Sequence, residues 1–76
     1  MRDRVRQTMA SVWSVPADDI PEDADTTSLP SWDSLRHLEL MLELEMSFGV
    51  RIPAEEVPEL TSIGAIEDAL REHGAA

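Results

Sequence analysis

Residues 34–48, SLRHLELMLELEMSF, constrain the fold most, because this one helical segment carries more apolar surface than a simple amphipathic helix needs. Its Leu, Met and Glu residues favour a helix, and Gly49 is typical of the position just beyond a helix end. At about 100° per residue, the main polar arc covers only about 80° of the helix. A helix that covers one core needs an apolar stripe of roughly 100° or a little more, and this segment has about twice that.

The surplus apolar side chains form a second stripe on the same helix. Leu40, Leu44 and Phe48 recur at i, i+4 and i+8, with Met41 beside them, so we assign this stripe to the core. The other stripe either is buried by surrounding elements or meets a partner protein. An apolar patch among acids suits a transient partner that is steered electrostatically. The second stripe and its flanking acids are Leu35, Leu38, Leu42 and Met46, with Glu39 and Glu45.

The N-terminal half of the chain predicts one helix followed by a long loop. Residues 2–14 place Val5, Met9 and Val12 on one helical face, with Trp13 beside it, and Pro16 ends the helix. Residues 16–33 are rich in Pro, Asp, Ser and Thr, which predicts an ordered loop with Ile20 and Leu29 as inward anchors. Such a long loop in so short a chain is often functional.

The C-terminal part predicts a short helix and a last main helix. Pro53 suits the first position of a short helix through Val57, and Thr61 or Ser62 can cap a helix that ends near residues 73–74. We therefore expect an all-α fold, a small four-helix bundle of three main helices and one short one, with residues 1–76 as a single domain. The chain has 76 residues and no cysteine, so its stability must come from packing alone.

The charge of the chain excludes some classes of partner. Sixteen acidic residues against six arginines, with no lysine, give a formal net charge of −10. This surface repels nucleic acid and anionic lipid, and it attracts basic patches on proteins, although acidity alone also serves solubility. No stretch approaches the roughly 20 apolar residues of a membrane span, and residues 1–13 lack the apolar core of a secretory signal. We expect a cytoplasmic protein that binds no membrane.

The start of the central helix allows three interpretations, which concern Asp33, Ser34 and His37. A hydrolase would need an acid behind the histidine and donors for an oxyanion, which adjacent residues on one helix do not provide. His37 is better explained as a partly buried packing residue. Asp33 can cap the free amides of the first turn. Ser34 can be a point of covalent attachment.

The stretch DSLRHLELMLELEMSFGVRIP closely resembles the acyl and peptidyl carrier proteins, and the resemblance covers nearly the whole chain. Their mark is Asp-Ser-Leu at the start of the second of four helices. The resemblance implies that Ser34 receives a 4′-phosphopantetheine arm from coenzyme A through a phosphodiester, and that Asp33 is the motif aspartate. A phosphate suits a helix N-terminus. The thiol of the arm would supply the nucleophile that this cysteine-free chain lacks.

The resemblance also implies the partners of the chain. A stand-alone, monomeric carrier is not itself an enzyme, and it meets a phosphopantetheinyl transferase and then acyl- or aminoacyl-loading and condensing enzymes with basic docking patches. The residues implied in docking match the surplus stripe: Leu35, Leu38, Glu39, Leu42, and Glu45 or Met46. The peptidyl or aminoacyl carriers of nonribosomal peptide pathways are an alternative within the family. An unmodified acidic helical adaptor that binds a basic partner is the alternative outside it.

The chain departs from the common carrier pattern on both sides of the serine. Pro30, Ser31 and Trp32 stand where many carriers have Gly or Ala before the aspartate, and Arg36 and His37 follow Leu35 where acidic or small polar residues are usual. These differences favour a specialised pathway, such as polyketide or nonribosomal peptide synthesis, over housekeeping fatty-acid synthesis. Trp32 either packs over the loop or contacts the arm and its partner.

Overall fold

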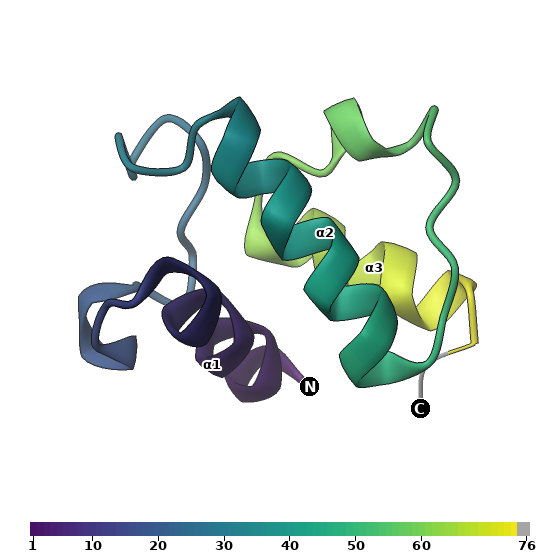
Figure 1. Cartoon of the computed structure of the whole chain (residues 1–76), viewed down its shortest axis with the longest axis horizontal. Helices are drawn as coiled ribbons and strands as arrows, with labels where there is room; N and C mark the ends of the chain where they lie inside the picture. The colour runs from purple at the N-terminus through teal and green to yellow at the C-terminus, as the bar shows by residue number, and fades with distance from the viewer. Residues whose placement is uncertain (75–76) are drawn as a thin grey trace.

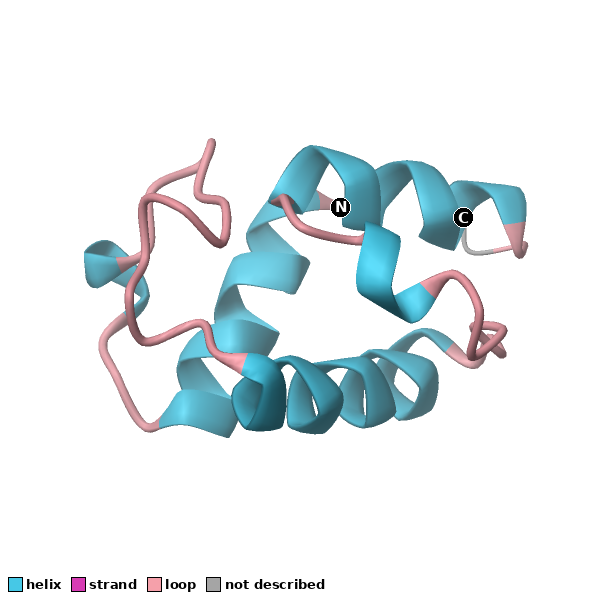
Figure 2. Ribbon diagram, turned by 90° about the horizontal axis from the view of Figure 1, so that it is seen from above, coloured by secondary structure: helices cyan, strands magenta, loops and turns pink. Residues whose placement is uncertain are grey.

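A computed structural model describes residues 1–74 of the chain as three α-helices joined by ordered loops (Figure 1). The helices are α1 (Arg2–Trp13), α2 (Ser34–Phe48) and α3 (Ile63–Glu72), and the loops contain two short 3₁₀ turns, η1 (Ala17–Asp19) and η2 (Val57–Glu59). Within residues 1–74 the β structure is limited to one isolated bridge between Asp25 and Ser62. Figure 2 shows helices and loops alone. The predicted all-α class is confirmed. No helix in the described range is long and apolar enough to span a bilayer.

Local chemistry sets both ends of α2 where the sequence predicts them. At the N-terminus, a side-chain oxygen of Asp33 accepts a hydrogen bond from the Arg36 amide at 2.9 Å. At the C-terminus, Gly49 adopts a left-handed conformation with φ 65°, which glycine reaches without strain. Ser62, rather than Thr61, caps α3 through a 3.1 Å bond from the Ala65 amide.

The buried face of α1 differs slightly from the predicted one. Val5, Met9 and Trp13 are buried at i, i+4 and i+8, whereas Val12 is only partly buried at the edge of the core. Tertiary contact explains the change, since the Trp13 indole N–H donates to the Arg36 carbonyl oxygen of α2 at 3.2 Å. Ser14, in a left-handed conformation, ends the helix one residue before the predicted bound.

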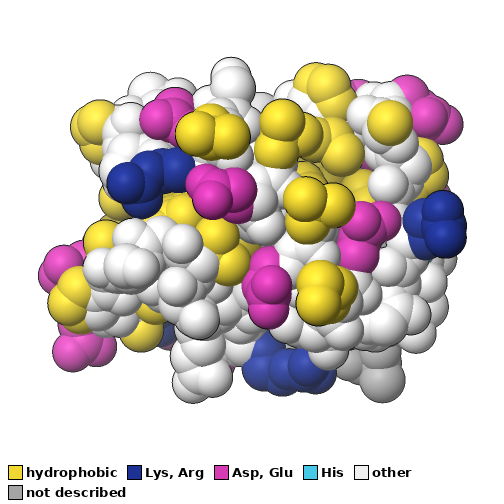
Figure 3. Space-filling view, in the orientation of Figure 1, with side chains coloured by type: hydrophobic (Ala, Val, Ile, Leu, Met, Phe, Trp, Pro, Cys, Tyr) yellow, Lys and Arg dark blue, Asp and Glu magenta, His cyan; other side chains and the backbone are white. Residues whose placement is uncertain are grey.

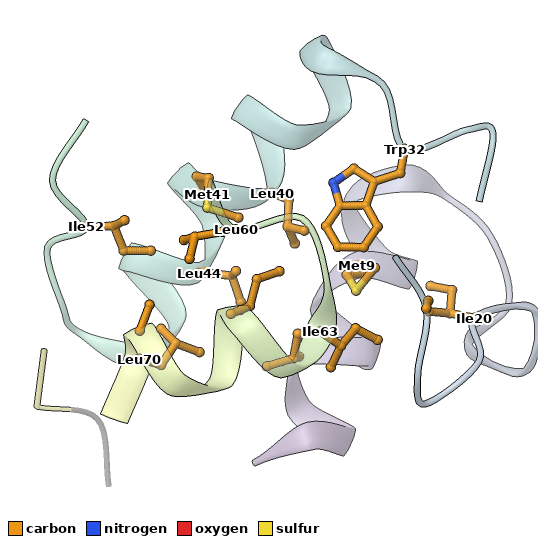
Figure 4. Packing of buried hydrophobic residues seen from close by; sticks show 14 of the residues in the cluster. Met9, Ile20, Trp32, Leu40, Met41, Leu44, Ile52, Leu60, Ile63 and Leu70 are labelled. Carbon is orange, nitrogen blue, oxygen red and sulfur yellow. The ribbon is translucent and has the colours of Figure 1, made fainter. Parts of the chain in front are cut away.

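The three helices enclose one hydrophobic cluster (Figure 4). From α2, Leu40 and Leu44 are fully buried and Met41 is nearly so, as predicted, but Phe48 is only partly buried. The Phe48 ring instead packs under the Arg4 guanidinium, 4.2 Å from the ring centroid. The other contributors come from α1, α3 and the loops: Val5, Met9, Trp13, Ile20, Ala24, Trp32, Ile52, Leu60, Ile63, Ile66, Ala69 and Leu70.

The predicted short helix from Pro53 to Val57 is misplaced. Residues 53–57 form turns with i to i+3 hydrogen bonds, and the helical segment is the 3₁₀ turn η2, in which Pro58 occupies an early position. Proline donates no backbone hydrogen bond, so it suits the first residues of such a turn as well as those of an α-helix. The segment thus exists, but it is shorter and later than expected.

The N-terminal arginines hold the loops to the helices. Arg6 donates from Nε to the Ile20 carbonyl at 2.7 Å, which fixes η1 against α1 and helps to bury Ile20, the predicted anchor. Leu29, the second anchor, is partly buried against the core. Arg2 pairs with the buried carboxylate of Glu67 on α3, and this hydrogen bond raises the pKa of Arg2 above its ordinary value.

Candidate functional site

Ser34 is the first residue of α2 and its side chain is exposed. The amides of the next turn have partners, since Arg36 donates to the Asp33 carboxylate and His37 donates to the Asp33 carbonyl at 2.8 Å. The amides of Ser34 and Leu35 have no hydrogen-bond partner within residues 1–74. They point out of the positive end of a helix dipole, which is a favourable place for a phosphate. The cap of α2 is Asp33, as the sequence predicts.

His37 is tied into a hydrogen-bonded bridge. The Trp32 indole N–H donates to His37 Nδ1 at 2.8 Å, and His37 Nε2 lies 2.7 Å from the Val57 carbonyl oxygen of η2. An acceptor at Nδ1 and a donor at Nε2 define the neutral imidazole with its proton on Nε2. Both ring nitrogens are therefore occupied, and neither can take a proton from Ser34. This geometry leaves His37 no free nitrogen to act as the base of a hydrolase, and His37 is a partly buried packing residue, as predicted.

Trp32 is a buried packing residue of the loop, which agrees with the first of its two predicted roles. Its side chain is 4% exposed, and its ring lies 5.7 Å from that of Trp13 and 5.9 Å from that of His37, measured between centroids. Trp32 also lines an open recess of about 420 Å³ beside Ser34. The recess is formed by the loop, the start of α2 and the segment around η2, through Thr26, Trp32, Asp33, Ser34, His37, Pro58 and Thr61.

The surplus stripe of α2 is exposed, so the other elements of residues 1–74 do not bury it. Leu35 is 68% exposed, Leu38 55%, Leu42 63% and Met46 77%. Figure 3 shows hydrophobic side chains with acidic ones between them on the molecular face over α2. Exposed leucines at this density are uncommon on a protein without a partner. We call Leu35, Leu38, Leu42 and Met46 the docking stripe, after the role that the sequence predicts for them.

The acids beside the docking stripe have different environments. Glu39 is exposed, whereas Glu45 is half-buried and accepts a hydrogen bond from the Ile52 amide at 2.7 Å. Glu45 thus fixes the chain after α2 as well as flanking the stripe. The sequence did not indicate that Val50 and Arg51 would join this surface, where they line an open groove of about 420 Å³ with Leu42, Glu45 and Met46.

Comparison with known proteins identifies the family. The family model described as "Phosphopantetheine attachment site" matches residues 3–70. The chain belongs to this family of carrier proteins. A solution structure of a holo acyl carrier protein from Geobacter metallireducens superposes with a TM-score of 0.80, covering 95% of this chain and 83% of that one at 19% identity. The carrier fold is therefore confirmed.

The cofactor of this carrier protein is a covalently bound 4′-phosphopantetheine group. The residues at the start of α2 fit such a group, because an exposed hydroxyl, an open recess and two first-turn amides without a partner among residues 1–74 lie together. Within residues 1–74, no cluster of His, Asp and Glu side chains is suited to a metal ion.

Proposed function

We propose that Ser34 is the residue that carries the 4′-phosphopantetheine group. The observation that carries this proposal is the position of the Ser34 hydroxyl, exposed at the first residue of α2 and beside the open recess. Phosphate oxygens attached there would accept hydrogen bonds from the free amides of Ser34 and Leu35. Asp33 keeps the first turn of the helix intact by holding the Arg36 amide.

The function that we propose is transport of an acyl or aminoacyl unit between enzymes, without catalysis by the chain itself. The group supplies a terminal thiol on which the unit is carried as a thioester. The chain contributes the attachment point, a rigid helix behind it and a surface that partner enzymes recognise. Its cysteine-free sequence fits a reducing cytoplasm, which we propose as its location.

We propose that partner enzymes bind the docking stripe and the acids around it. These partners are a phosphopantetheinyl transferase and acyl- or aminoacyl-loading and condensing enzymes. The exposed leucines supply apolar contact, and Glu39 with the net charge of −10 would steer basic patches toward α2. The unusual neighbours of Ser34, namely Trp32, Arg36 and His37, favour a specialised pathway such as polyketide synthesis over housekeeping fatty-acid synthesis. A nonribosomal peptide carrier is the alternative within the family.

The attachment proposal is tested by intact mass after incubation with coenzyme A and a broad-specificity phosphopantetheinyl transferase. The wild-type chain should gain the mass of one phosphopantetheine group. Ser34→Ala should gain nothing, and Ser47→Ala, which removes another exposed serine of α2, should behave as wild type. A wild-type chain that stays unmodified would instead favour an acidic helical adaptor.

A further inference from the structure

The bridge from Trp32 through His37 to Val57 lies between the recess beside Ser34 and the hydrophobic interior. It connects three segments, since Trp32 belongs to the long loop, His37 to α2 and the Val57 carbonyl to η2. Both bonds are short, at 2.8 and 2.7 Å. The bridge therefore holds the start of α2 against η2 at the inner side of the recess.

The interior behind the bridge is filled by packed side chains. Trp32 is part of the buried cluster, as Figure 4 shows, and Leu40 and Leu60 belong to the same cluster at 0% and 6% exposure. The Trp13 ring of α1 packs against Trp32 at an interplanar angle of 55°, so the indole cannot rotate inward without displacing a second buried ring. An apolar chain that passed from the recess into the core would have to enlarge a packed cluster.

Such a chain would also have to break the bridge. Separation of His37 from its partners would leave the Trp32 indole N–H and the Val57 carbonyl unpaired in a half-buried region, which is costly. Entry of a chain would therefore combine two lost hydrogen bonds with overpacking, and both costs oppose the gain from burying its methylene groups. The recess itself, at about 420 Å³, has room for a small unit over Trp32 and Pro58.

We infer that the Trp32–His37–Val57 bridge excludes cargo attached at Ser34 from the hydrophobic interior. The cargo then lies in the recess beside Ser34. The inference rests on Ser34 as the attachment residue. His37 then acts as a specificity-determining residue, and the cargo class that fits is a short acyl or aminoacyl unit, in place of a long aliphatic chain that needs an apolar interior.

Chemical attachment tests this inference without any transferase. The chain has no cysteine, so Ser34→Cys introduces a single thiol at the required position. We would alkylate this variant with iodoacetamide or with N-octyl iodoacetamide, confirm each adduct by mass, and compare ¹H–¹⁵N spectra. Failure of the transferase reaction on the wild-type chain would refute the attachment proposal and leave this measurement unaffected.

With His37 present, the octyl adduct should shift the signals of the Thr26 and Thr61 amides and of the Trp32 indole N–H, because these three residues line the recess. The amides of Leu44 and Ile66, which are fully buried, should not move relative to the iodoacetamide adduct. Shifts of the buried amides as large as those of the recess would overturn the inference. So would an octyl chain that shifts no signal in the recess.

A second background tests the role of His37. His37→Ala should allow the octyl group to shift the Leu44 and Ile66 amides, whereas His73→Ala, which removes the other histidine and its bond to Glu56, should not. If His37→Ala fails to fold, Trp32→Phe replaces it, because this substitution keeps an aromatic ring but removes the indole N–H donor. In Trp32→Phe the octyl group should likewise shift the Leu44 and Ile66 amides. Equal octyl-induced shifts with His37 present, in His37→Ala and in His73→Ala would show that the bridge does not determine where the chain lies.

Discussion

The division of α2 into a core stripe and a docking stripe can be tested by one substitution made at two positions of the helix that are two residues apart and face in nearly opposite directions. Leu44 is 0% exposed and Leu42 is 63% exposed, although both are leucines in the interior of the same helix. Replacement by alanine changes the helix propensity equally at both sites. A difference in stability between the two variants therefore measures burial alone.

The magnitudes expected for the two variants are well separated. Truncation of a fully buried leucine costs about 2–5 kcal/mol, because apolar contact is lost and a cavity remains. A domain of this size has a free energy of unfolding of about 4–11 kcal/mol, at roughly 0.05–0.15 kcal/mol per residue. Leu44→Ala at about 3 kcal/mol should lower the melting temperature by about 12–24 °C, since each kcal/mol corresponds to about 4–8 °C. Leu42→Ala should change the free energy of unfolding by no more than about 0.5 kcal/mol.

The assay is urea unfolding followed by far-UV circular dichroism, with thermal melting of the same samples. Equal slopes with denaturant would show that both variants expose the same surface on unfolding, so that the midpoints can be compared. A loss of stability in Leu42→Ala comparable to that in Leu44→Ala would refute the reasoning. It would mean that Leu42 contributes to the core and does not belong to an exposed docking surface.

Three further predictions concern the residues around Ser34. Leu38→Glu should lower kcat/KM for a phosphopantetheinyl transferase about tenfold or more while the melting temperature stays nearly unchanged; a chain that unfolds would place Leu38 in the core. His37→Gln should still accept the phosphopantetheine group, as intact mass would show, and a complete loss of attachment would assign His37 a direct role. Asp33→Ala should cost about 1 kcal/mol of folding free energy because the Arg36 amide loses its cap, and an unchanged unfolding midpoint would contradict that role.

The elements with strong local chemistry were predictable from the sequence. Asp33 and Gly49 mark the two ends of α2 by side-chain capping and by a left-handed backbone, both of which depend on residue type at one position. The two apolar stripes of α2 follow from helical periodicity, and the exposure of Leu38 and Leu42 agrees with the assignment. The position of Ser34 at the helix start followed from the same signals.

The errors arose where distant contacts decide the structure. Trp13 replaces Val12 in the core because it contacts Arg36, which lies 23 positions further along the sequence, and also Trp32. The bridge through His37 needs a carbonyl group at Val57, and no local pattern indicates a hydrogen bond between residues that are 20 positions apart. The recess beside Ser34 depends on the same contacts, so sequence patterns alone did not reveal it.

Localisation of the added group is the measurement that tests the central claim most directly. The wild-type chain would be treated with coenzyme A and a phosphopantetheinyl transferase, cleaved, and sequenced by tandem mass spectrometry. The account predicts that the phosphopantetheine mass lies on Ser34 alone. Finding the mass on Ser31 or on any other serine, or finding no added mass, would contradict it.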